Sequence, residues 1–94
     1  MTPPTFEIRP GLCIEIQPVA DSVRLRWCVA GALTCLFDPS DGTWQPEGHE
    51  SKTRFEGIAP ADLALIEARL RLYAEERRRQ LAAQHVTALL FFES

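Results

Sequence analysis

Residues 6–16 read FEIRPGLCIEI, with apolar and polar side chains alternating on both sides of a Pro-Gly pair. Alternation with a period of two is typical of β-strands that bury one face. A three-residue loop over residues 9–11 therefore predicts a hairpin whose two strands share one apolar face, since a slip of one residue would mix the faces. The apolar pairs predicted across this hairpin are Phe6 with Ile14 and Ile8 with Leu12.

The same alternation extends through residues 23–44. A turn over residues 29–31 is favoured over a two-residue turn, because it keeps the apolar residues together and puts a glycine at the left-handed end of a turn with a bulge. The pairs predicted across this turn are Trp27 with Leu33, Leu25 with Cys35 and Val23 with Phe37. A second turn, over residues 39–42, then sets Phe37 against Trp44.

After this second turn the alternation weakens. Pro46 ends the strand or keeps it at an edge of the sheet, because proline cannot donate a backbone hydrogen bond. The polar stretch EGHESK, residues 47–52, predicts a loop, and residues 53–57 predict one more short strand that turns Phe55 inward. Residues 6–56 as a whole predict an antiparallel meander of five or six short strands.

A helix covers the apolar face of this sheet in the predicted fold. Residues 59–80 read APADLALIEARLRLYAEERRRQ, and their apolar residues recur at helical spacing. The helix is expected over residues 61–82, and Asp62 suits its positive N-terminal end. The stripe that faces the sheet comprises Leu63, Ile66, Leu70, Tyr73 and Ala74. The sequence thus predicts a single α+β domain over residues 1–94, with one long amphipathic helix packed on the meander.

The helical sequence changes character after Ala74. Residues 75–80, EERRRQ, cover more than one turn of 3.6 residues, so this turn is expected to be polar on every side and to project into water. Residues 86–92, VTALLFF, are uncharged, and they predict either a C-terminal strand buried on both faces, which is favoured, or an extension of the helix. In both cases this segment needs a cover. The candidates for an oligomer interface, a homodimer included, are Leu89, Leu90, Phe91 and Phe92.

The composition is that of an ordinary globular chain. Of the 94 residues, 46% are hydrophobic and 24% are charged, and the net charge is −3. Enough apolar side chains are present to form a core, and the acidic balance gives no general affinity for polyanions. The N-terminus shows no basic and apolar leader, and the longest apolar run is well short of the roughly 20 residues that span a bilayer. We therefore expect a cytoplasmic protein that contacts no membrane.

The sequence contains no motif that predicts catalysis or a bound cofactor. Cys13, Cys28 and Cys35 are odd in number, and the cysteines and histidines lack the close spacing of a zinc site. Strand alternation places Cys13 and Cys28 on the polar face and Cys35 in the core. His49 is expected in a loop and His85 at a helix end. We therefore interpret the cysteines as small apolar residues and expect no enzyme activity, no metal and no cofactor.

Arginines provide the candidate contact residues. Two of them, Arg24 and Arg26, alternate out of the apolar face of the meander. The others follow along the helix: Arg69, Arg71, Arg77, Arg78 and Arg79. Arginine binds phosphates, and it is also enriched at protein interfaces. Because acidic residues lie among these arginines and no aromatic side chains interleave with them, the pattern favours contact with protein over contact with nucleic acid.

Together these features predict a small non-enzymatic cytosolic module that binds another protein, as an adaptor or a stoichiometric inhibitor. Small acidic domains without motifs are frequent among phage and mobile-element products such as anti-CRISPR proteins, which is an analogy of size and style and not of residues. The alternative is a nucleic-acid-binding regulator that uses the arginine-rich helix end, residues 77–79.

Overall fold

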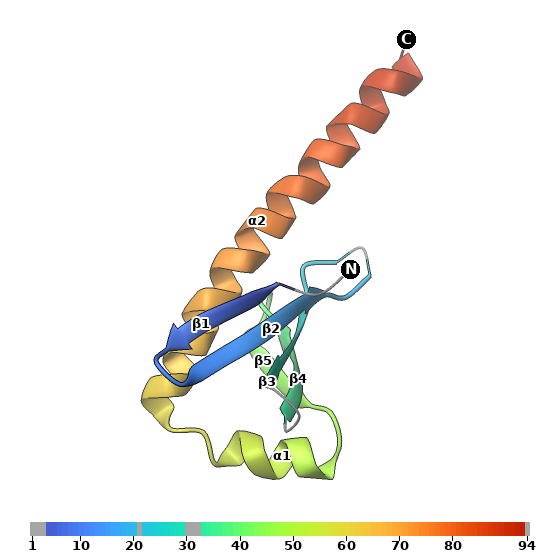
Figure 1. Cartoon of the computed structure of the whole chain (residues 1–94). Helices are drawn as coiled ribbons and strands as arrows, with labels where there is room; N and C mark the ends of the chain where they lie inside the picture. Colours follow the sequence, from blue (N-terminus) through green and yellow to red (C-terminus); the bar gives the residue numbers. More distant parts are fainter. Residues whose placement is uncertain (1–3, 21, 30–32, 94) are drawn as a thin grey trace.

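The structure, a computed structural model, describes residues 4–20, 22–29 and 33–93, with side chains described as far as residue 83. Within these ranges the chain forms five strands followed by two helices (Figure 1). The elements are β1 (Thr5–Arg9), β2 (Leu12–Pro18), β3 (Leu25–Val29), β4 (Leu33–Asp38), β5 (Thr43–Pro46), α1 (His49–Glu56) and α2 (Pro60–Glu93). The sheet and α1 lie at one end of a molecule that measures 54 × 26 × 26 Å, and α2 extends away from them (Figure 1).

The five strands form one antiparallel meander in the order β1-β2-β3-β4-β5. The first hairpin sets Phe6 opposite Ile14, as the sequence predicts. Its register then shifts within β1, so that Leu12 lies opposite Arg9 and not opposite Ile8. The predicted pair of Ile8 with Leu12 is therefore wrong, because a bulge beside the turn takes up one extra residue of β1.

The second hairpin, β3–β4, keeps the predicted apolar face in a different register. Its partners are Leu25 with Phe37, Trp27 with Cys35 and Val29 with Leu33. Each residue of β3 thus pairs two positions further along β4 than predicted, and the same residues still face the helix because a shift of two preserves the face. The next predicted pair, Phe37 with Trp44, is confirmed. Residues 30–32 of the turn lie outside the described residues.

Residues 49–56 form helix α1 and not the predicted loop and strand. Phe55 is the single large apolar residue among its eight, so the stretch carries no helical periodicity. Two contacts hold it to the sheet. The buried Ser51 hydroxyl accepts a 3.1 Å hydrogen bond from the backbone N–H of Thr34, and the Phe55 ring lies 5.7 Å from the Trp44 ring. Short helices depend on such tertiary contacts more than on intrinsic propensity.

Helix α2 covers the apolar face of the meander, as predicted. Its inward stripe of Ile66, Leu70 and Ala74 is at most 2% exposed. The sheet presents the other buried apolar side chains: Ile14, Ile16, Leu25, Trp27, Leu33, Cys35 and Phe37. Burying a side chain the size of leucine or phenylalanine contributes roughly 1.5–3 kcal/mol, so this contact between layers is the main source of stability. The fold is therefore of the α+β class, with a long helix on an antiparallel sheet.

Helix α2 continues to Glu93, so the strand favoured for residues 86–92 is wrong. No glycine or proline lies between residues 61 and 94 to end the helix. At 1.5 Å per residue its 34 residues extend about 51 Å, whereas the seven residues of β2 cover about 23 Å. The helix therefore runs well beyond the sheet (Figure 1). The side chains of Leu89, Leu90, Phe91 and Phe92 lie outside the described residues, and their role in an oligomer stays a prediction.

Candidate functional site

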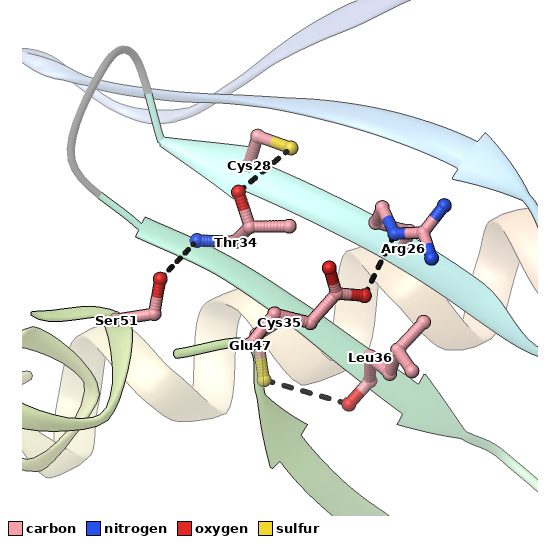
Figure 2. Close-up of polar contacts among 7 residues, drawn as sticks. All are labelled: Arg26, Cys28, Thr34, Cys35, Leu36, Glu47 and Ser51. Carbon is pink, nitrogen blue, oxygen red and sulfur yellow. Dashed lines mark hydrogen bonds and ion pairs between the residues drawn. The ribbon is translucent and has the colours of Figure 1, made fainter. Parts of the chain in front are cut away.

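The sheet face opposite α2 is polar and carries Arg26. Its Nε donates a 2.8 Å hydrogen bond to Glu47 Oε1, in an ion pair that joins β3 to the residue after β5 (Figure 2). Both side chains are more than a third exposed, so the pair contributes at most about 1 kcal/mol to stability. Arg24, just before β3, forms no side-chain ion pair with another described residue. The two sheet arginines thus differ, because Arg26 has an ion-pair partner among the described residues and Arg24 has none there.

Two arginines of α2 contact the sheet side of their own chain. The Arg69 guanidinium lies 3.9 Å from the centroid of the Phe6 ring, which is a cation–π contact. Arg71 pairs with Glu67 at 3.3 Å, one turn earlier, and donates a 3.4 Å hydrogen bond to the Pro39 carbonyl oxygen. These contacts join α2 to β1 and to the β4–β5 turn.

The three consecutive arginines of α2 have different surroundings. Arg77 is half-buried, and its Nη2 donates a 3.2 Å hydrogen bond to the Ala20 carbonyl oxygen, while its Nε has no partner among the described residues. Arg78 pairs with Glu75 at 3.5 Å. Arg79 is exposed, and its side chain has no hydrogen bond or ion pair with another described residue. The expectation that this turn projects into water on every side is wrong, because Arg77 reaches the β2–β3 connection.

The seven candidate arginines do not form one surface. Arg24 and Arg26 belong to the polar side of the sheet, whereas the other five lie on α2 at the opposite face. Five of the seven are engaged within the chain: Arg26, Arg69, Arg71, Arg77 and Arg78. A phosphate-binding surface needs several free cations that converge. Within the described residues this arrangement does not supply one.

The cysteines lie as strand alternation predicts, with Cys13 exposed, Cys28 partly exposed and Cys35 buried. Burial raises the pKa of the Cys35 thiol to about 11, so this thiol stays protonated at neutral pH. Cys28 borders a hollow of about 540 Å³ that His49 also lines. His49 is the first residue of α1, so the expectation that it lies in a loop is wrong. The Cys28 sulfur lies 3.7 Å from Thr34 Oγ1 (Figure 2). Across the described ranges, no group of three or more His, Cys, Asp or Glu residues is placed to hold a metal ion.

A second hollow, of about 310 Å³, opens where the β3–β4 hairpin meets the connection from α1 to α2. Its lining is mainly apolar, and its charged residues are Arg54 and Asp62. Arg9 holds Asp62 by two hydrogen bonds, from Nε at 2.8 Å and from Nη2 at 3.1 Å. These bonds lower the pKa of the Asp62 carboxyl. Arg54 in turn lies 3.8 Å from Glu50, so both charged groups are engaged within the chain and neither is free to orient a ligand.

The face of α2 that points away from the sheet carries two exposed leucines. Leu65 is 46% exposed and Leu72 is 61% exposed, and within the described residues no other large apolar side chain is as exposed. They lie seven residues apart, which is two helical turns, and so they share one face. We name the exposed residues that continue this face the outer seam: Ala61, Leu65, Ala68, Leu72, Glu75, Arg79 and Ala82.

The outer seam is not among the candidate sites predicted from the sequence, because the stripe that faces the sheet already accounts for an amphipathic helix. A signal was present in the spacing. Ala61, Leu65, Ala68 and Leu72 are separated by steps of four, three and four residues, which is the pattern of a coiled-coil contact. A helix with one apolar stripe against its own sheet and a second stripe facing out is suited to contact a further partner.

Comparison with known protein families, with curated proteins and with solved structures finds no match to this chain. None of the helices within the described ranges combines the length and the apolar character that crossing a bilayer requires. What the protein does is therefore inferred from its own surfaces, of which the outer seam is the most distinctive.

Proposed function

We propose that this protein is a small protein-binding module, an adaptor or a stoichiometric inhibitor, that contacts its partner through the outer seam of α2. One observation carries the proposal: Leu65 and Leu72 are 46% and 61% exposed on a helix face that no described part of the chain covers. Neighbouring exposed apolar side chains mark protein interfaces, and amphipathic helices bind by anchors at this kind of spacing. In this proposal the protein acts in the cytoplasm, performs no catalysis and has the character of a phage or mobile-element product.

The charge distribution supports a protein partner over nucleic acid. The whole chain has a net charge of −3, and five of the seven candidate arginines already have partners within the chain. Non-specific affinity for nucleic acid depends on several cations that release counterions together. Binding to another protein by burial of apolar surface, by contrast, needs only exposed apolar side chains on one face, and the outer seam supplies them.

The test is a capture experiment with matched variants. Changing Leu65 and Leu72 to serine should abolish capture of the partner from the native host lysate and leave the circular dichroism spectrum unchanged, because both side chains are exposed. The control changes Arg24 and Arg26 to alanine on the opposite side of the molecule, and it should capture the partner as the wild type does. The reverse result, with capture lost only in the arginine variant, would place the interface on the sheet.

The nucleic-acid alternative predicts a different outcome at the helix end. Binding of an oligonucleotide there would weaken steeply with salt, with a slope of roughly one per phosphate contact. It would also be lost when Arg78 and Arg79 are changed to alanine, whereas Arg77 is kept because it contacts the body of the protein. We expect no such binding, and a steep salt slope that depends on these two residues would overturn the protein-binding assignment.

A further inference from the structure

The outer seam lies on the side of α2 opposite the stripe that packs on the sheet. Successive residues of an α-helix are about 100° apart, so Leu65 and Leu72 point about 100–160° away from the buried Ile66 and Leu70. The exposures agree with this placement, because Ile66 and Leu70 are 0% exposed whereas Leu65 and Leu72 are 46% and 61% exposed. A partner on the outer seam would therefore not compete with the sheet.

The residues of the outer seam recur with steps of three and four, and the sequence carries the same spacing on to Val86 and Leu89. In a helix pair this spacing gives a narrow seam between the two helices. The order of side chains along it is nearly symmetric about the level of Arg77. Residues equally distant from Arg77 on the two sides form these pairs: Glu75 with Arg79, Leu72 with Ala82, Ala68 with Val86, and Leu65 with Leu89.

From this symmetry we infer that the partner of the outer seam is a second copy of the same chain, bound antiparallel with the two-fold axis at the level of Arg77. About this level an antiparallel pair sets apolar residues against apolar residues at three of the four pairs and Glu75 against Arg79 at the fourth, so the seam is complementary to itself, as a two-fold interface requires. The inference rests on the proposed protein-contact role of the outer seam and narrows it: the protein that Leu65 and Leu72 contact is a second copy of this chain, and a role as adaptor or inhibitor then uses another surface of the dimer. In the dimer, the part of α2 that runs beyond the sheet lies along the exposed face of the other copy.

Charge complementarity fixes the direction of the pairing. In the antiparallel arrangement Glu75 of each copy meets Arg79 of the other, which gives two pairs of opposite charge. A parallel arrangement would set Glu75 against Glu75 and Arg79 against Arg79, and like charges that face each other across an interface are strongly unfavourable. Arg79 has no described partner of its own, and the exposed ion pair of Glu75 with Arg78, at 3.5 Å, is a weak competitor.

The first test uses charge reversal and mixing. Light scattering on the wild type should give twice the chain mass of 10.6 kDa. Glu75→Arg and Arg79→Glu should each weaken the dimer by at least about tenfold, because each sets like charges across the seam. An equimolar mixture of the two variants should recover a heterodimer, detected by native mass spectrometry. In each variant residues 75 and 79 of one helix carry like charges, and mixing does not change that. Recovery of the dimer on mixing would therefore report on a contact between the two chains and not on a contact within one helix.

The second test fixes the register with cysteine cross-links. In a background of Cys13→Ser and Cys28→Ser, the pair Leu72→Cys and Ala82→Cys should give a covalent dimer on mild oxidation, whereas Leu72→Cys alone should not. Cross-linking by Leu72→Cys alone at the same rate would show a parallel pair and overturn the inference. A wild type that stays monomeric at about 100 μM, or a dimer indifferent to both charge reversals, would also overturn it.

These outcomes separate this inference from the proposed function on which it rests. A monomer that still captures another protein through Leu65 and Leu72 would refute the homodimer and leave the protein-binding role in place. A chain that neither dimerises nor loses any capture on changing these two leucines to serine would refute both. Circular dichroism on each variant confirms that the comparison is made between folded chains.

Discussion

The inner and outer faces of α2 both carry apolar side chains over residues 61–74, yet the described residues cover only one of them. On the inner face Ile66 and Leu70 are 0% exposed, beneath the sheet. On the outer face Leu65 and Leu72 remain 46% and 61% exposed. The five-stranded sheet covers one side of the helix, so the apolar residues on its other side stay exposed among the described residues and are available to a partner.

The contrast in exposure between the two faces of α2 shows which side chains specify the fold and which are available for binding. A helix that needs only its own sheet would place polar residues on its outer face. Leu65 and Leu72 depart from that pattern and lie seven residues apart on one face, with Ala68 between them. This regularity is why we assign the outer seam to a partner and the inner stripe to the core.

The largest expected effect separates two leucines that lie two positions apart. Leu70→Ala empties a fully buried site and should lower the free energy of unfolding by about 2–5 kcal/mol. Leu72→Ala removes a side chain that is 61% exposed and should change the free energy of unfolding by no more than about 0.5 kcal/mol. Urea denaturation at a protein concentration low enough to keep the chain monomeric measures both. Equal losses for the two variants would mean that the outer face is covered within the monomer.

Removal of residues 84–94 should have the next largest effect, on association. In the proposed antiparallel dimer this segment would supply Val86 and Leu89, opposite Ala68 and Leu65 of the other copy. We expect the dimer to weaken by more than tenfold, measured by light scattering over a dilution series. The domain should stay folded, because Ala74 is the last buried residue of the helical stripe among the described side chains. A truncated chain that no longer unfolds cooperatively would instead assign the segment to its own core.

Much of this architecture could be predicted from side-chain periodicity. Alternation in residues 6–16 and helical spacing after Pro60 each bury one face, and the structure confirms the layers that they predict. The register of β3 with β4 could not be predicted in this way. Both registers put Leu25 and Trp27 on the covered face, so periodicity does not distinguish them.

Other features depend on contacts that a single sequence does not encode locally. Helix α1 has no apolar period, and it is held by the hydrogen bond of Ser51 to the Thr34 backbone, across seventeen residues of sequence. Arg9 and Asp62 are fifty-three residues apart in sequence and are still joined by two hydrogen bonds. For the same reason the sequence identifies the arginines but not which of them are already engaged. The apolar run at 86–92 is compatible with a strand, which the sequence favours, and with a helix, because periodicity does not distinguish them in so short a run.

A smaller effect should distinguish two arginines on one turn of α2. Arg77→Met removes the 3.2 Å hydrogen bond to the Ala20 carbonyl oxygen, and we expect a loss of about 1 kcal/mol in the free energy of unfolding. Arg78→Met is the matched control, because Arg78 is exposed and pairs only with Glu75. Its loss should be too small to resolve. Both are measured by urea denaturation, and a larger loss in Arg78→Met would show that the inner face does not extend to this turn.

The smallest effect concerns the contact that ties the start of α2 to β1, and it should depend on pH. Arg9 donates two hydrogen bonds to Asp62 and thereby lowers the pKa of its carboxyl in the folded protein. A carboxyl whose pKa is lower when folded stabilises the fold above its ordinary pKa of 3.8, and this contribution is lost as the pH falls through the lowered value. Asp62→Asn should therefore be less stable than the wild type near pH 6, and the difference should close on acidification.

Arg9→Gln should behave in the same way, and the double variant should lose no more stability than either single variant, as expected for partners in one contact. A gap that persists unchanged to about pH 2 would show that Asp62 acts through packing at the beginning of the inner face and not through its charge.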